Sequence, residues 1–117
     1  IKSVGKGFVE AVEADEEYSP QTEQVVRAVV EPIINKGADV LVLGCTHYPF
    51  LRDVIAKVIG DRNVEIIDSG EAVEKRVESL LDEYDLRAES GHKAEYEFVS
   101  FAADDYADRL RRKAFSK

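Results

Sequence analysis

The sequence predicts an α/β domain, with a doubly wound and mostly parallel sheet flanked by helices. The run over residues 38–44 is short and almost wholly apolar, which is typical of a strand that is covered on both faces, and residues 64–68 are predicted to form a second buried strand. Each run lies between two stretches whose apolar residues have the spacing of an amphipathic helix. Strands that alternate with crossover helices predict parallel pairing with right-handed connections.

The amino-terminal part contains one ambiguous segment and one clear helix. Residues 8–18, FVEAVEADEEY, could form either a helix or an acidic loop. After them, Ser19 is a candidate N-cap, Pro20 suits the first helical position, and Gly37 is a stop signal. The apolar stripe of this helix consists of Val25, Val26, Val29, Val30, Ile33 and Ile34.

The middle of the chain continues the alternation of strands and helices. The strand over residues 38–44 is followed by a predicted helix over 49–59. The strand over 64–68 is followed by a second predicted helix over 69–84. The apolar residues of the second helix are Ala72, Val73, Val77, Leu80 and Leu81.

The carboxyl-terminal part is predicted to be a separate piece. A polar linker over residues 85–93 precedes AEYEFVSF, residues 94–101, which alternates like a third strand. A last helix is predicted over 104–115. We therefore divide the chain into a main lobe over residues 1–85 and a terminal strand and helix over 86–117.

Composition limits the classes of function. The 117 residues are one domain's worth of chain, and 44% hydrophobic with 34% charged residues is typical of a globular protein. The net charge of -8 argues against nucleic acid or an anionic membrane as the main partner, because both require clustered Lys and Arg. The one basic group suits the last turn of a helix and consists of Arg109, Arg111, Arg112 and Lys113.

The cysteine count and the absence of targeting signals predict a compartment. One Cys cannot form an internal disulfide, and no segment resembles a signal peptide or a bilayer-spanning run. We therefore expect a reducing cytoplasm. The chain starts at Ile1 and contains no Met, so we expect it to be a piece of something longer.

The motif LVLGCTHYPFL, residues 41–51, carries the candidate chemistry. Cys45 and Thr46 fall at the carboxyl end of the first predicted strand, where parallel sheets bind ligands. Pro49 suits the first position of the next helix, so the turn over 46–48 would present free backbone N–H groups and the positive end of a helix dipole. This environment favours a bound carboxylate and the thiolate form of a cysteine.

Spacing alone leaves the roles of these residues open. A lone Cys that ends a buried strand is more often a packing residue than a catalytic one. His47 could make a capping hydrogen bond, or it could bind substrate, shuttle a proton or stabilise the thiolate. One Cys and two His, with His92 in the polar linker, do not make a zinc ligand set, so no metal is expected.

Several segments carry a resemblance to the bacterial glutamate racemases of the aspartate/glutamate racemase superfamily. ADVLVLGCTHYPFL resembles the second active-site motif of that family. FVEAVEADEEYSP, VEIIDSGEAV and YEFVSFAADDYADRLRRKAF are similar to further family segments, so the resemblance covers nearly all of the chain. Aspartate racemases usually have an acidic residue where His47 stands, which points to glutamate.

The resemblance implies one lobe of a two-lobe racemase fold, the carboxyl-terminal half, and roles for four residues. Cys45 would be one of two catalytic cysteines, a proton donor or acceptor on one face of the substrate α-carbon. Thr46 and His47 would contact the substrate, and His47 would also be catalytic by assisting the thiol. Glu13 would line the site and support that histidine.

The resemblance also implies a cofactor-independent bacterial enzyme that supplies D-glutamate for peptidoglycan. Its partners would be glutamate and the family's amino-terminal lobe, with a homodimer as a possible assembly, and its compartment would be the cytoplasm. Asp68 and Ser69 match a family turn, but capping of a helix beside Gly70 explains them at least as well.

The chain departs from the family in two places. The family tends to have Ala-Cys-Pro where this chain has Val4, Gly5 and Lys6. The amino-terminal lobe, which brings the other cysteine, has no counterpart in the 117 residues. Racemisation without pyridoxal phosphate needs an acid and a base on opposite faces of the α-carbon, so we expect this chain alone to be inactive.

Two other classes of function stay open. The chain could be a non-catalytic α/β module that binds a small dicarboxylate, or a scaffold or regulatory fragment that uses its acidic surface. In the family, the terminal strand and helix rejoin the amino-terminal lobe. Without that lobe, Tyr96, Phe98 and Phe101 would leave an exposed apolar face that could serve as an interface.

Overall fold

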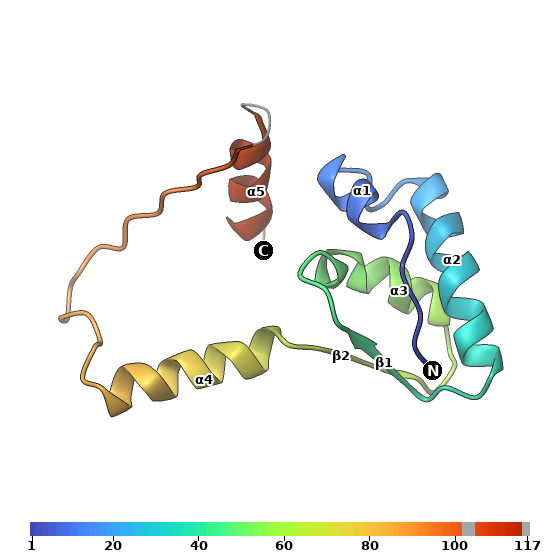
Figure 1. The fold of residues 1–117 in the computed structure, drawn as a ribbon, viewed down its shortest axis with the longest axis horizontal. Coiled ribbons are helices and arrows are strands. Elements are labelled where there is room, and N and C mark those ends of the chain that lie inside the picture. The colour runs from blue at the N-terminus through green and yellow to red at the C-terminus, as the bar shows by residue number, and fades with distance from the viewer. Residues whose placement is uncertain (102–104, 116–117) are drawn as a thin grey trace. The chain divides into compact units, whose positions relative to one another are not determined.

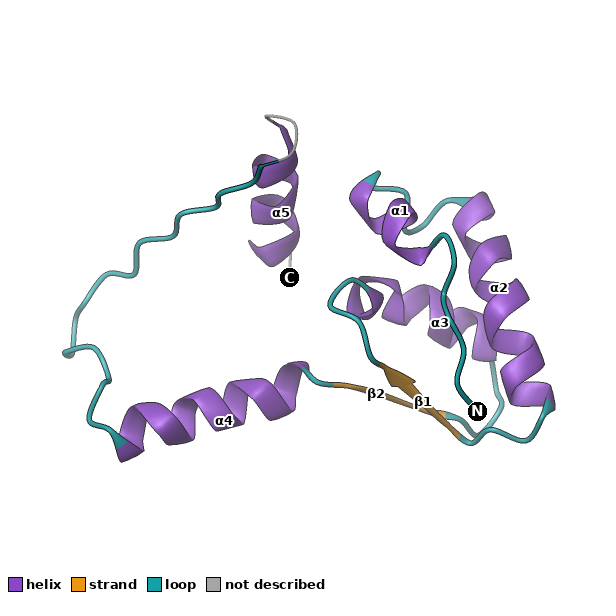
Figure 2. Cartoon of the chain, viewed as in Figure 1, coloured by secondary structure: helices purple, strands orange, loops and turns teal. Residues whose placement is uncertain are grey.

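The structure is a computed structural model that describes residues 1–101 and 105–115 (Figure 1). The chain divides into two compact units, Ile1–Lys75 and Arg76–Lys117. Figure 2 shows the strands of the described residues in orange, and both of them belong to the first unit. The site predicted from the sequence therefore has to be built from the first unit.

The first unit begins with an irregular segment and a short helix. The helix α1 (Phe8–Glu13) starts after Gly7, whose positive φ of 88° costs a glycine little. Phe8 and Val12 lie one helical turn apart and are both buried, so one face of α1 belongs to the core. The ambiguous segment over residues 8–18 is thus helical at its start and turns afterwards.

The helix α2 (Pro20–Asn35) has the signals that the sequence predicts. The Ser19 side chain accepts a hydrogen bond from the backbone N–H of Thr22 at 3.1 Å, and proline occupies the first position. Val26 and Val30 of the predicted stripe are buried. The chain leaves the helix through Gly37, at a φ of 89°.

Two parallel strands, β1 (Val40–Leu43) and β2 (Glu65–Asp68), form the sheet. Between them lie a 3-10 helix, η1 (Tyr48–Leu51), and the helix α3 (Arg52–Ile59). This order confirms the predicted α/β fold with a parallel sheet. The register pairs Val40 with Glu65, Leu41 with Ile66, Val42 with Ile67 and Leu43 with Asp68.

The core lies on one face of the sheet. Leu41 and Leu43 of β1 point into it, together with buried side chains of α1, α2, η1 and α3. Val42 points to the other face and is 71% exposed. The prediction that this strand is covered on both faces is therefore wrong for the described residues, because the helices that pack on β1 share one face. The core residues are Phe8, Val12, Val26, Val30, Leu41, Leu43, Leu51, Val54, Ile55, Val58 and Ile59.

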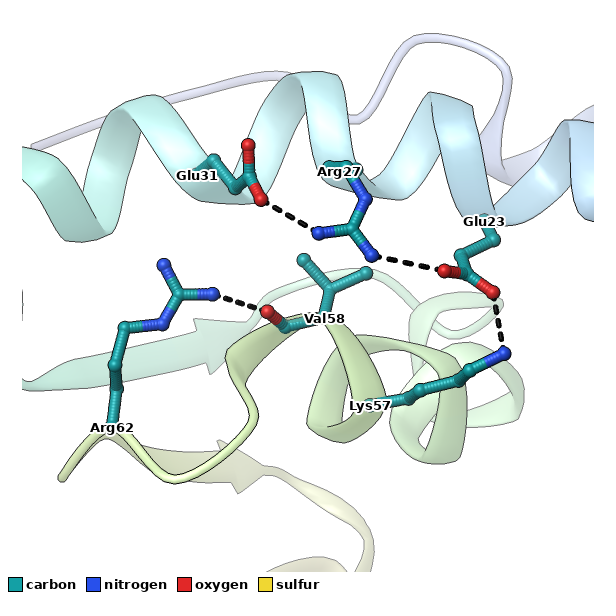
Figure 3. A network of polar contacts seen from close by, with 6 residues as sticks. All are labelled: Glu23, Arg27, Glu31, Lys57, Val58 and Arg62. Carbon is teal, nitrogen blue, oxygen red and sulfur yellow. Dashed lines mark hydrogen bonds and ion pairs between the residues drawn. The ribbon is translucent and has the colours of Figure 1, made fainter.

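A network of charged side chains joins α2 to α3 (Figure 3). Glu23 of α2 accepts hydrogen bonds from Lys57 of α3 at 2.6 Å and from Arg27 at 2.9 Å. These two cations lower the pKa of the Glu23 carboxyl. Arg27 also donates to Glu31 at 2.7 Å, and the two carboxylates raise its pKa.

The helix α4 (Gly70–Glu83) begins in the first unit and continues into the second. It follows the prediction over residues 69–84 closely, yet none of its side chains is buried within the described chain. The helix α5 (Asp105–Phe115) confirms the prediction from residue 105 on, while residue 104 lies outside the described residues. No helix in the described ranges has both the length and the apolar character needed to cross a bilayer.

The predicted third strand over residues 94–101 is wrong, because the structure has irregular chain there. A strand needs a neighbour that satisfies its backbone N–H and C=O groups, and these residues pair with none of the described segments. Instead, the rings of Tyr96 and Phe98 lie edge-on to Phe115 of α5, with centroids 4.9 and 5.9 Å away. Alternation of apolar residues therefore produced an extended segment without a ladder.

Candidate functional site

The loop over residues 44–47 joins β1 to η1 and carries three of the predicted site residues. The backbone N–H of Tyr48 donates to the carbonyl of Cys45 at 3.1 Å, and the N–H of Phe50 donates to the carbonyl of His47 at 3.2 Å. These bonds close a tight 3-10 turn. The expectation that Tyr48 offers a free N–H is therefore wrong, since the turn itself uses that group.

Cys45 lies two residues after the last residue of β1, at the carboxyl end of the strand as predicted, and is only partly buried. It is outside the hydrophobic core, whose β1 members are Leu41 and Leu43. A cysteine that only filled space in the core would be expected among those residues. The residue is therefore neither a core residue nor fully exposed.

His47 and Glu13 come together from different elements. Glu13 is the last residue of α1, and its Oε1 lies 3.4 Å from Nε2 of His47. The two side chains are partly accessible, with 43% of Glu13 and 27% of His47 exposed. A carboxylate can only accept a hydrogen bond, so this contact favours a proton on Nε2.

Thr46 faces the other nitrogen of the same imidazole. Its Oγ1 lies 3.5 Å from Nδ1 of His47, at the outer limit of a hydrogen bond. When Nε2 carries the proton, Nδ1 accepts from the Thr46 hydroxyl. Both nitrogens of His47 therefore have an oxygen partner, and the loop after β1 presents a thiol, a hydroxyl and an oriented imidazole.

Asp68 is the last residue of β2, and Ser69 follows it. Asp68 pairs with Leu43, the last residue of β1 before this loop. Asp68 Oδ1 accepts the backbone N–H of Gly70 at 2.9 Å, which is the helix-start role weighed from the sequence. Its Oδ2 accepts from Arg52 at 2.9 Å, and Arg52 also donates to the carbonyl of Ile66 at 3.0 Å. Both carboxylate oxygens of Asp68 thus serve local structure.

Sequence reasoning did not anticipate Arg52 or the contacts of Tyr48. The hydroxyl of Tyr48 accepts the backbone N–H of Gly5 at 3.2 Å, and its ring lies edge-on to Phe8 with centroids 5.2 Å apart. A backbone donor leaves no signal in the sequence, and a lone Arg after a helix start has many possible partners. Both contacts could be found only from the structure.

A cavity of about 200 Å³ lies beside β1 and is lined mainly by apolar side chains. Tyr48 and all four residues of β1 contribute to its wall, but Cys45, Thr46 and His47 do not. The predicted site residues therefore lie outside this cavity. Among the residues that the structure describes, no three His, Cys, Asp or Glu side chains gather closely enough to hold a metal ion.

Residues 4–77 match the family model described as Asp/Glu/Hydantoin racemase. This range contains every predicted site residue. Among curated proteins, the chain is 46% identical over 83 residues to a glutamate racemase from Pseudomonas putida and 49% identical over 80 residues to one from Herpetosiphon aurantiacus. These matches cover 71% and 68% of this chain but 31% of each relative, so the chain spans about a third of their length.

Solved structures show the same similarity in three dimensions. The glutamate racemase from Thermus thermophilus, in complex with β-chloro-D-alanine, superimposes with a TM-score of 0.72 at 32% identity. This match covers 88% of the present chain and 40% of that one. A glutamate racemase isoform from Bacillus anthracis, 24% identical, has the same fold with a TM-score of 0.76 and covers 95% and 41% of the two chains.

Proposed function

Because the chain belongs to the Asp/Glu/Hydantoin racemase family, we propose that it is the carboxyl-terminal lobe of a glutamate racemase and supplies one of the two catalytic thiols. The observation that carries this proposal is the loop after β1, which contains both Cys45 and His47 and brings the His47 imidazole to 3.4 Å from Glu13. The curated relatives described above are glutamate racemases, which favours glutamate over other amino acids as substrate.

The proposed reaction moves one proton off the α-carbon of glutamate and one proton onto it. The thiolate of Cys45 takes the α-proton from one face and becomes a thiol, while a second thiol protonates the opposite face and becomes a thiolate. The products are the opposite enantiomer and an enzyme whose two sulfurs have exchanged protonation states. Each direction of the reaction therefore swaps acid and base, and no cofactor is consumed.

The other residues of the loop orient the reacting groups. His47 is oriented by its contact with Glu13, whose Oε1 lies 3.4 Å from Nε2, and from this position it assists the thiol. Thr46 and His47 contact the substrate, and the start of the helical segment favours its carboxylates. Glu13 acts through His47 and does not need to touch the substrate.

The proposal extends to partners and to the compartment. The substrate is glutamate, and an amino-terminal lobe with a second cysteine completes the site, because the 117 residues contain only one. The product, D-glutamate, serves peptidoglycan synthesis in the bacterial cytoplasm. A homodimer is a further prediction.

A non-catalytic module that binds a small dicarboxylate is the second candidate, and the single cysteine favours it. The same loop would then bind glutamate through Thr46 and the backbone while no proton moved. The two candidates differ in one observable, the exchange of the substrate α-proton with solvent. A scaffold or regulatory fragment would not bind glutamate, so glutamate would not protect its thiol from alkylation.

The binding part of the proposal is tested by alkylation of the single thiol. The purified chain is treated with iodoacetamide near neutral pH, alone and with L-glutamate, D-glutamate or L-glutamine. We expect both glutamate enantiomers to slow the labelling of Cys45 and glutamine, which lacks the side-chain carboxylate, to slow it less. Labelling that glutamate does not affect would contradict the proposal, and Cys45→Ser shows that no other residue reacts.

A further inference from the structure

Tyr48 lies next to His47 in the chain and binds the segment that leads into α1. Its hydroxyl accepts the backbone N–H of Gly5 at 3.2 Å. Its ring lies edge-on to Phe8, the first residue of α1, with centroids 5.2 Å apart and planes inclined by 69°. An edge-on contact between two aromatic rings adds stabilisation to that gained from burying their apolar surface.

Gly5 fits this arrangement because it lacks a side chain. The residue is buried, and a Cβ added to it would lie 2.5 Å from Cδ2 of Phe8. A larger residue would displace either the Phe8 ring or the Gly5 backbone, and with it the N–H that Tyr48 accepts. We call the three residues Gly5, Phe8 and Tyr48 the Tyr48 clamp.

The clamp fixes α1 against the loop that carries the thiol. Glu13 lies five residues after Phe8, about 7.5 Å along the helix axis at 1.5 Å per residue. A tilt of α1 at the clamp therefore moves the Glu13 carboxylate away from Nε2 of His47, which it approaches to 3.4 Å. Since α1 has only six residues, its packing and not its intrinsic stability decides where it lies.

We propose that Tyr48 is a positioning residue for the Glu13–His47 pair. This proposal rests on the proposed function, in which Glu13 supports His47 at the thiol. Tyr48 contacts no reacting atom in this scheme. It sets the distance between a carboxylate on one element and an imidazole on another, through a hydrogen bond and a ring contact to the start of α1.

The test is nitrogen NMR of the imidazoles in the full chain. The chain has two histidines, so His92 serves as an internal control for His47. Glu13→Gln defines the change in the ring ¹⁵N shifts of His47 when the carboxylate is lost. We expect Tyr48→Phe, which removes only the hydroxyl, to shift the same signals in the same direction, and Tyr48→Leu to shift them further.

Two further variants separate positioning from a general loss of structure. Gly5→Ala leaves Tyr48 intact but disturbs the clamp, so it should also shift the His47 signals. Tyr84→Phe removes the hydroxyl of an exposed tyrosine in the second unit and should leave them unchanged. The amide signals of β1 and β2 report whether each variant keeps its sheet.

These NMR measurements test the positioning role without an assay of catalysis. His47 signals that change in Glu13→Gln but stay at their original positions in Tyr48→Phe, Tyr48→Leu and Gly5→Ala would overturn it. Addition of L-glutamate to the same samples tests the proposed function separately. If glutamate does not change the wild-type His47 signals, this result counts against glutamate binding. The positioning role is tested separately, by comparing the variants without glutamate.

Discussion

The proposed function gives the contact between Glu13 and His47 a role in the site, whereas the exposure of both side chains predicts little effect on stability. Both side chains are partly solvent-accessible, and ion pairs at such positions contribute between nothing and about 1 kcal/mol. In the proposed mechanism the carboxylate orients His47, because an acceptor near Nε2 favours the tautomer that carries its proton on that nitrogen. Stability and function should therefore respond differently to the loss of Glu13.

Glu13→Ala tests this difference. We expect the free energy of unfolding to change by less than about 1 kcal/mol, since the pair is exposed. We expect the protection of Cys45 by glutamate to fall strongly, because His47 is no longer held. Urea unfolding and iodoacetamide labelling measure the two quantities. Full protection in the variant, at unchanged stability, would show that Glu13 has no part in the site.

For single residues, the sequence predicts which of them belong to the candidate site better than it predicts their contacts. The position of Cys45 after the strand follows from the apolar run that precedes it, and the structure places it there. Only the family resemblance predicts a role for Glu13, because no spacing rule links this residue to His47. The bond from Gly5 to Tyr48 has a backbone donor and could not be read from side-chain chemistry.

At the scale of elements, η1 anchors the loop to the core. Its last residue, Leu51, is completely buried, while Tyr48 at its first position holds α1. The side chain of Leu51 lies in the cluster formed by α2, α3 and β1. The loop with the thiol is thus fixed at one end by β1 and at the other by a core residue.

Leu51→Ala should destabilise the chain by about 2–5 kcal/mol, because it removes buried methyl groups and leaves a cavity. Val42→Ala is the control, since Val42 is 71% exposed and its truncation should change stability by less than about 0.5 kcal/mol. Both variants are compared by urea unfolding followed by circular dichroism. Equal effects of the two substitutions would contradict the described core.

The ionic link between α2 and α3 predicts a pH dependence of stability. Lys57 and Arg27 lower the pKa of Glu23, so the folded state favours the ionised carboxyl. Its contribution is complete above the ordinary pKa of 4.5 and is lost as the pH falls through the lowered folded-state value.

Glu23→Gln removes this contribution. The stability difference between wild type and variant should be largest near neutral pH and should shrink as the solution is acidified below pH 4.5, the ordinary value for this group. Urea midpoints measured over a series of pH values give the two curves. Curves that run parallel into the acid range would show that the link to Lys57 and Arg27 is not made in solution. Glu74→Gln, on the exposed face of α4, is the matched control.

Elements could be predicted where local signals agree with packing. The N-cap, the proline and the valine stripe predict α2, and two runs rich in apolar residues predict β1 and β2. The run over residues 94–101 has an equally clear pattern but no neighbour in the described chain, and a strand depends on its neighbour. The prediction of a helix over 49–59 is confirmed as an α-helix from residue 52 on, and the residues before it form a 3-10 helix because of the tight turn after Cys45.

At the scale of the whole molecule, the chain spans about a third of the curated relatives that it matches. One unit contains the sheet and all predicted site residues, and the other contains α5 and the aromatic contacts of Tyr96 and Phe98. In the proposed mechanism, the single cysteine of this chain reaches one face of the substrate α-carbon. The chain should therefore move a proton on one face without inverting the centre.

Exchange of the glutamate α-proton in D₂O tests this claim most directly. The 117-residue chain is incubated separately with L- and D-glutamate, and proton NMR and chiral chromatography follow deuteration and enantiomer content. We predict slow deuteration of one enantiomer, no interconversion, and loss of the exchange in Cys45→Ala. Interconversion by this chain, or exchange that persists in Cys45→Ala, would contradict the account, and exchange of neither enantiomer would favour a module that only binds glutamate.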